Sequence, residues 1–136
     1  HVLAVLDEPA HAALFGPDAL AEAPIAAVVE GQVIAGTVDR LLVTADAVHV
    51  VDFKTGRSVP NGADAVPPSH ARQMAAYAAA LAEIFPRRAI RASLLYTAGP
   101  RLIDLPTDHL AAHKPRLGAS EQFLLPLDLE TSASAD

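Results

Sequence analysis

The feature that most constrains the fold is a pair of neighbouring segments rich in aliphatic and β-branched residues. They are "QVIAGTVDRLLV" at 32–43 and "AVHVVDFK" at 47–54. The short stretch "TADA" between them suits a hairpin turn, so the two segments are predicted to pair as antiparallel strands. A third apolar run, "IAAVVEG", precedes them and closes at Gly31. We therefore predict three antiparallel strands, near residues 25–30, 32–43 and 47–54.

The rest of the chain predicts helices that pack on this sheet. Residues 2–17 have a helical pattern that Pro9 interrupts, and residues 55–68 have no periodic pattern. Ser69 is expected to cap a helix over 70–85. Its apolar stripe consists of Met74, Tyr77, Ala78, Leu81, Ile84 and Phe85. Further strands are predicted at 89–97 and 101–106, a short helix at 107–114, and an edge strand within 123–129. The element order indicates an α/β or α+β fold.

Length and composition limit the classes of protein that this chain can belong to. The 136 residues suit a single domain over 1–136, with 130–136 as a disordered polar tail. The absence of cysteine excludes disulfides, thiolate zinc sites and cysteine-ligated iron–sulfur clusters. A net charge of −6 argues against a broad basic surface for nucleic acid. No apolar run approaches the roughly 18 residues of a membrane span, and we expect a cytoplasmic protein with no membrane partner.

Two acidic residues in the predicted hairpin suggest a metal site. Because side chains alternate along a strand, Asp52 and Lys54 share a face with Val48 and Val50. By the same alternation, Asp39 lies in an aliphatic row of the preceding strand, and the hairpin register places it almost opposite Asp52. Two carboxylates at this separation repel each other unless a proton or a cation lies between them. Oxygen ligands of this kind suit Mg²⁺ or Mn²⁺.

Each of these residues also has a structural interpretation. An Asp-x-Lys sequence on a strand is more often a surface ion pair of little energetic value. Gln73 and Tyr77, spaced i and i+4, project to the same side of the predicted helix. They either form a core tyrosine with a polar neighbour or extend toward the strand end that carries Asp52 and Lys54. His49 faces away from Asp52 and is predicted to be structural.

The order of these motifs resembles the nuclease motifs of the RecB-like branch of the PD-(D/E)XK superfamily. The matching stretches are "GTVDR", "VVDFKTGR" and "RQMAAY". The resemblance implies a restriction-endonuclease-like fold, a mixed β-sheet core flanked by helices. It also implies the following roles: Asp39, Asp52 and the Phe53 carbonyl as metal ligands, Lys54 as the catalytic lysine, and Gln73, Tyr77, Arg40 and Thr55 as supporting or DNA-contacting residues.

The flanking segments are "LFGPDALAEAPIA" before these motifs and "PRRAIRASLLYTAGPRLIDLP" after them. They resemble the C-terminal nuclease domain of AddA-type bacterial helicase–nucleases. This resemblance implies a Mg²⁺-dependent DNA exonuclease without an iron–sulfur cluster, acting in double-strand-break repair and recombination. Its partners would be DNA, the helicase portion of the same polypeptide and an AddB-type subunit. The family also has an upstream helix with a metal-binding histidine, and His1 does not stand in that context. We therefore expect a fragment of a longer protein. The alternative is a catalytically inactive module that serves as a structural or partner-binding domain.

Overall fold

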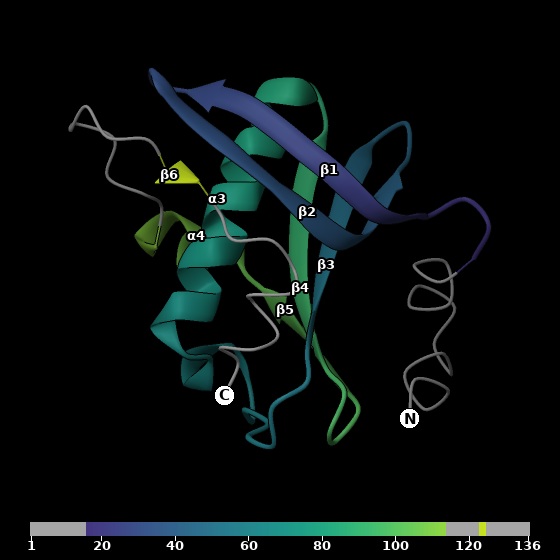
Figure 1. Cartoon of the computed structure of the whole chain (residues 1–136), viewed down its shortest axis with the longest axis vertical. Helices are drawn as coiled ribbons and strands as arrows, with labels where there is room; N and C mark the ends of the chain where they lie inside the picture. Colours follow the sequence, from purple (N-terminus) through teal and green to yellow (C-terminus); the bar gives the residue numbers. More distant parts are fainter. Residues whose placement is uncertain (1–15, 114–122, 125–136) are drawn as a thin grey trace.

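A computed structural model describes residues 16–113 and 123–124 (Figure 1). The predicted helical segment before residue 16 and the polar tail at 130–136 lie outside the described residues. In chain order the elements are β1 (Leu20–Val29), β2 (Gln32–Val43), β3 (Ala47–Lys54), the 3₁₀ turn η1 (Ala63–Ala65), α3 (Pro68–Ile84), β4 (Ala89–Tyr96), β5 (Arg101–Leu105), α4 (Thr107–Ala112) and β6 (Phe123–Leu124).

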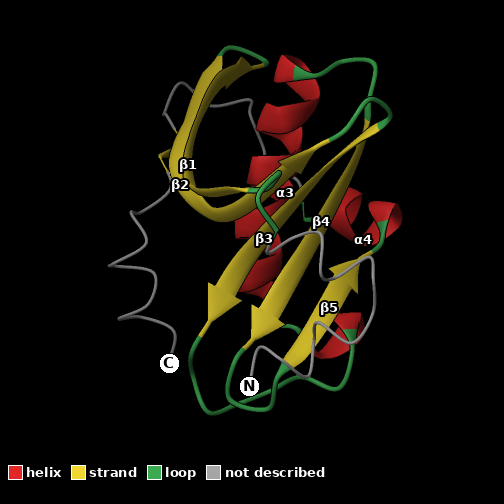
Figure 2. Ribbon diagram, turned by 90° about the vertical axis from the view of Figure 1, so that its right-hand side faces the viewer, coloured by secondary structure: helices red, strands yellow, loops and turns green. Residues whose placement is uncertain are grey.

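The sheet is mixed, with the order β1-β2-β3-β4-β5. β3 and β4 are parallel, and the other neighbours along this path are antiparallel (Figure 2). β6 adds a short parallel pair to β2. The predicted antiparallel arrangement of the first three strands is confirmed, although β1 begins at Leu20 rather than near residue 25. A mixed sheet with flanking helices confirms the predicted α+β, restriction-endonuclease-like class.

The β2–β3 hairpin forms where the sequence predicts it. The amide of Thr44 donates to the carbonyl of Ala47 at 2.8 Å, and the Thr44 hydroxyl donates to the same carbonyl at 3.1 Å. These bonds close the turn and fix the register, which pairs Val43 with Val48 and Arg40 with Val51. A fixed turn therefore sets which residues lie opposite each other at the far end of the hairpin.

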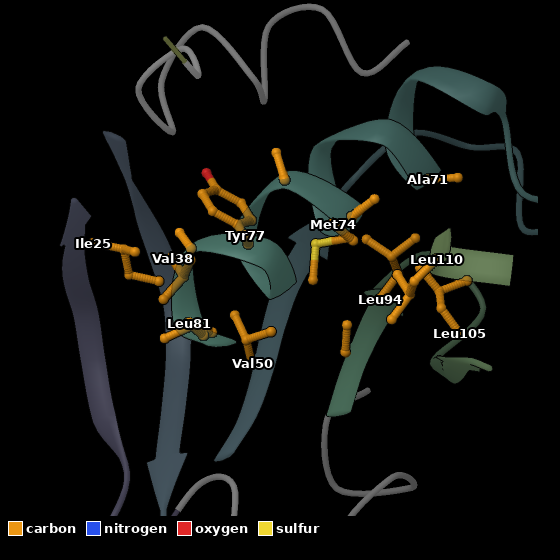
Figure 3. Packing of buried hydrophobic residues seen from close by; sticks show 14 of the residues in the cluster. Ile25, Val38, Val50, Ala71, Met74, Tyr77, Leu81, Leu94, Leu105 and Leu110 are labelled. Carbon is orange, nitrogen blue, oxygen red and sulfur yellow. The ribbon is translucent and has the colours of Figure 1, made fainter. Parts of the chain in front are cut away.

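Helix α3 covers one face of the sheet and provides much of the core. Met74, Tyr77 and Leu81 are almost fully buried. Figure 3 shows them beside Val38 and Val50 of the strands. Ile84, which the predicted stripe included, is instead 43% exposed at the helix end. No helix in the described part of the chain is long and apolar enough to cross a membrane.

The start of α3 differs from the prediction. Ser69 is not the N-cap: the cap is Pro67, which makes no side-chain capping bond, and Pro68 takes the first helical position. Proline suits this position because its fixed φ is helical and the missing N–H would have no intrahelical partner. Ser69 lies inside the first turn instead.

Strand β2 bends near Asp39, which strict alternation did not predict. Val38 and Leu41 both belong to the core on the α3 side, although they are three positions apart and strict alternation would put them on opposite faces. The bend lies between the pairs Ala21–Arg40 and Ala23–Val38, and the intervening Glu22 has a positive φ of 51°. Figure 2 shows β1 and β2 curving around α3, whereas β3, β4 and β5 run side by side. The predicted continuous aliphatic row through Asp39 is therefore wrong.

Candidate active site

The β2–β3 hairpin brings Asp39 and Asp52 together at the end of its register. Arg40 pairs with Val51, so the next position of the same register sets Asp39 opposite Asp52. Asp39 Oδ2 accepts a hydrogen bond of 2.7 Å from the backbone N–H of Phe53. A side-chain hydrogen bond with Asp39 also contributes to the raised pKa of Asp52. The two carboxyl groups therefore share one site rather than pointing to opposite faces of the sheet.

Asp52 lies in an environment that disfavours its negative charge. Burial is the largest effect, and the hydrogen bond with Asp39 comes next; together they raise the pKa of Asp52 to about 7. The positive charge of Lys54 acts in the opposite direction and only partly offsets them. In the absence of a cation, Asp52 therefore keeps its proton below about pH 7.

One oxygen of Asp52 is available to a cation. Asp52 Oδ2 lies 3.1 Å from Lys54 Nζ, but among the described residues it has no partner in hydrogen-bond geometry. The contact is thus an ion pair that does not meet hydrogen-bond geometry. A buried oxygen of this kind, beside a second carboxylate, matches the hard-oxygen ligands that Mg²⁺ prefers.

Lys54 is held from two sides. Its side chain is 3% exposed, and Nζ donates a 2.7 Å hydrogen bond to Gln73 Oε1 on α3 in addition to the contact with Asp52. Gln73 is itself buried. A buried ammonium needs such partners to offset the cost of its desolvation. The helix therefore fixes the position of the ammonium group beside the carboxylate pair.

Tyr77 is placed differently from Gln73, although both lie on the same side of α3. The Tyr77 hydroxyl donates a 3.3 Å hydrogen bond to the Thr37 carbonyl on β2. This contact is two residues before Asp39, close to the bend. Of the two alternatives left by the sequence, Gln73 reaches the strand end with Lys54, whereas Tyr77 is a core residue that holds the strand carrying Asp39.

The remaining predicted site residues lie around this centre. Arg40 and Phe53 are half-buried, and the Phe53 N–H is the donor to Asp39 described above. Thr55 is exposed directly after β3. His49 lies on the opposite face, where its Nε2 is 2.7 Å from the Ser93 hydroxyl, and its predicted structural role agrees with this burial.

Sequence reasoning missed a second pair beside Lys54. His70, which opens the predicted helix over 70–85, is half-buried, and its Nδ1 lies 2.9 Å from the Tyr96 hydroxyl. Tyr96 is the ladder partner of Lys54 in the parallel β3–β4 pair. Alternation along β4 predicts that Tyr96 and Leu94 share a face of the sheet. The sequence does not show that β4 pairs with β3 in parallel, and this pairing is what places Tyr96 beside Lys54.

A family model for the PD-(D/E)XK nuclease superfamily matches residues 5–127. The chain belongs to the PD-(D/E)XK nuclease superfamily. Membership indicates a nuclease-type function, and nucleases of this superfamily generally use divalent metal ions, commonly Mg²⁺. The Asp39–Asp52 pair fits that requirement, although the described residues hold no cluster of three or more histidine, aspartate or glutamate side chains able to bind a metal.

Comparisons with individual proteins add little. No curated protein matches the sequence. The crystal structure of SSO0001 is similar at 20% identity, with a TM-score of 0.45, over 76% of this chain and 53% of that chain. This chain thus spans about half the length of that protein, and at this TM-score the likeness supports no argument about fold or function.

Proposed function

We propose that this domain is a Mg²⁺-dependent DNA exonuclease domain of the AddA type. The observation that carries the proposal is the Asp39–Asp52 pair, in which Asp52 is buried and one of its oxygens has no hydrogen-bond partner among the described residues, beside an ammonium fixed by Gln73. A purely structural core has no need of a carboxylate pair that burial and mutual repulsion destabilise. Membership of a nuclease superfamily supports a role for this arrangement in phosphodiester hydrolysis.

The chain's own residues would divide the work of phosphodiester hydrolysis as follows. Asp39, Asp52 and the Phe53 carbonyl would hold the cation, which when bound supplies positive charge at the phosphate oxygens. Lys54 would orient the attacking water or stabilise the charge that develops on the phosphate. Gln73 keeps the Lys54 ammonium in place, so that little reorganisation is needed during the reaction.

The wider context rests on the resemblance of the flanking segments to AddA-type proteins. Within such an assembly, a helicase motor would deliver the strand, an AddB-type subunit would be the partner, and the complex would process double-strand breaks in the cytoplasm. The net charge of −6 supports this division of labour, because a domain without broad positive charge relies on other parts for most of its grip on DNA.

The test combines Mn²⁺ calorimetry with degradation of single-stranded DNA by the wild type and by Asp39→Asn, Asp52→Asn and Lys54→Met variants. Asp46→Asn is the matched control, because it removes an exposed carboxylate at the turn of the same hairpin. We expect both site aspartate variants to lose Mn²⁺ binding and activity. Lys54→Met should bind Mn²⁺ but lose on the order of a hundredfold or more in rate.

Two outcomes would count against the proposal. Full activity in Lys54→Met, or in either site aspartate variant, would remove the assigned roles. Mn²⁺ binding without hydrolysis by the wild type would favour the inactive, partner-binding module instead. The two-carboxylate site, with no third acidic or histidine ligand among the described residues, is the observation that keeps this second function in consideration.

A further inference from the structure

A pocket of about 330 Å³ lies where β3 and β4 end and α3 begins. Lys54 and Tyr96 form one wall, residues of the loop after β3 form another, and Ser69 and His70 of the first turn of α3 complete it. Its volume falls within the range of small-ligand sites, which is about 300–1,000 Å³. Asp39 and Asp52 are not among its lining residues, so the pocket is adjacent to the metal site and joined to it through Lys54.

The polar groups of this pocket are held in place. Lys54 and Tyr96 are ladder partners on neighbouring parallel strands, so their side chains leave the same face side by side. Both residues are almost completely buried, at 3% and 1% exposure. The Tyr96 hydroxyl lies 2.9 Å from His70 Nδ1, and the two rings are 5.9 Å apart between centroids. This contact orients the imidazole at the pocket wall.

The chemistry of the pocket favours an anion. Its lining includes Lys54, whose ammonium also contacts Asp52 and Gln73. The other polar lining residues are His70, Ser58 and Ser69, and none of the described lining residues is acidic. The first turn of the 17-residue helix α3 adds the positive end of the helix dipole. In a chain of net charge −6, a pocket whose described lining residues include no carboxylate is a local exception.

Tyr96 supports a donor role for His70. Burial raises the pKa of Tyr96 to about 12, so its hydroxyl keeps its proton throughout the neutral range. When that hydroxyl donates to Nδ1, the neutral imidazole carries its own proton on Nε2, which is the form that donates to a phosphate oxygen. Tyr96 thus acts on the ligand through His70, as a positioning residue.

We propose that this pocket binds a phosphate-bearing nucleotide of the DNA strand next to the one being cleaved, with His70 as the contact to the phosphate. The proposal rests on the proposed nuclease function for the identity of the strand. Binding of the phosphate group itself depends only on the pocket. A short oligothymidylate and free thymidine 5′-monophosphate carry the same group and distinguish a strand site from a mononucleotide site.

The test is a titration of the chain, followed through its histidine NMR resonances, in the presence of a chelator so that no metal takes part. The probes are thymidine 5′-monophosphate, oligothymidylate and unphosphorylated thymidine. We expect the phosphorylated probes to shift the His70 resonances and thymidine to leave them unchanged. His49, on the opposite face of the sheet, is the internal control and should not shift.

Two variants complete the test. His70→Ala should weaken oligothymidylate binding on the order of tenfold, as expected for loss of one charge-assisted hydrogen bond. Tyr96→Phe keeps the buried ring, so the core is preserved, and should weaken binding several-fold through His70 alone. Binding unaffected by both variants, or no saturable shift of His70 with any phosphorylated probe, would overturn the proposal.

These outcomes are separate from those of the nuclease test. A shift of His70 in a protein that degrades no DNA would sustain the pocket and reject the proposed activity. Degradation of DNA without any shift of the His70 resonances would support the proposed activity and reject the phosphate pocket. Stronger binding of the monophosphate than of the oligothymidylate would overturn the strand site in favour of a mononucleotide site.

Discussion

Replacing Asp52 with asparagine in the absence of divalent cations tests the electrostatics of the carboxyl pair. Burial, followed by the hydrogen bond with Asp39, raises the pKa of Asp52 from 3.8 to about 7 in the folded protein. Since the unfolded chain ionises near the lower value, the folded state binds more protons between these two pH values. Stability from this group is therefore fully present below about pH 4 and is lost as the pH rises to about 7.

The size of this effect follows from the shift. At about 1.36 kcal/mol per pKa unit, the loss is at most about 4 kcal/mol across the window. Asparagine is neutral at every pH, and its amide can donate to Asp39 as the protonated carboxyl does. The Asp52→Asn variant should therefore lack this part of the pH dependence and exceed the wild type in stability at pH above about 7.

Urea unfolding in the presence of a chelator, at several pH values on both sides of this window, measures the difference. Asp46→Asn is the control and should keep the wild-type slope, because its carboxylate is exposed in the hairpin turn. Mg²⁺ should then stabilise the wild type at the higher pH, by about 2.7 kcal/mol at a hundred times its Kd, but not the variant. Equal slopes for the wild type and Asp52→Asn would refute the reasoning.

Two further predictions concern the support of the site and the core. Tyr77→Phe removes the donor to the Thr37 carbonyl and should lower the free energy of unfolding by about 1 kcal/mol in urea; no change would show that this bond does not hold β2. The Leu81 side chain is 1% exposed, and Leu81→Ala should lower the free energy of unfolding by about 2–5 kcal/mol in the same assay. Leu20 is 56% exposed, and Leu20→Ala should change this free energy by no more than about 0.5 kcal/mol. Similar losses for both leucine variants would contradict the position of the core.

The local geometry of the candidate site was predictable because it depends on short-range rules. A turn around Thr44–Ala47 fixes the register, and the register places Asp39 beside Asp52. Alternation along β3 puts Asp52 and Lys54 on one face, and the i, i+4 spacing puts Gln73 and Tyr77 on one side of α3. Each inference uses only residues that are close in the chain.

Other features depend on contacts between distant segments, and the sequence did not reveal them. The bend of β2 brings both Val38 and Leu41 into the core, which alternation alone excludes. The start of α3 was misplaced because Ser69 is a good capping residue, whereas the cap is Pro67 and the helix begins at Pro68, two residues earlier than predicted. In β2, the packing of the curved hairpin against α3 outweighs the local alternation.

The sequence by itself determined the class of fold and the set of acidic, basic and amide groups that the site contains. Only the tertiary structure decided how these groups behave. The parallel pairing of β3 with β4 puts Tyr96 beside Lys54, and the packing of α3 buries Asp52 and brings His70 to Tyr96. The physical reason is that pKa values and pockets arise from desolvation and from distant neighbours, which a local pattern does not specify.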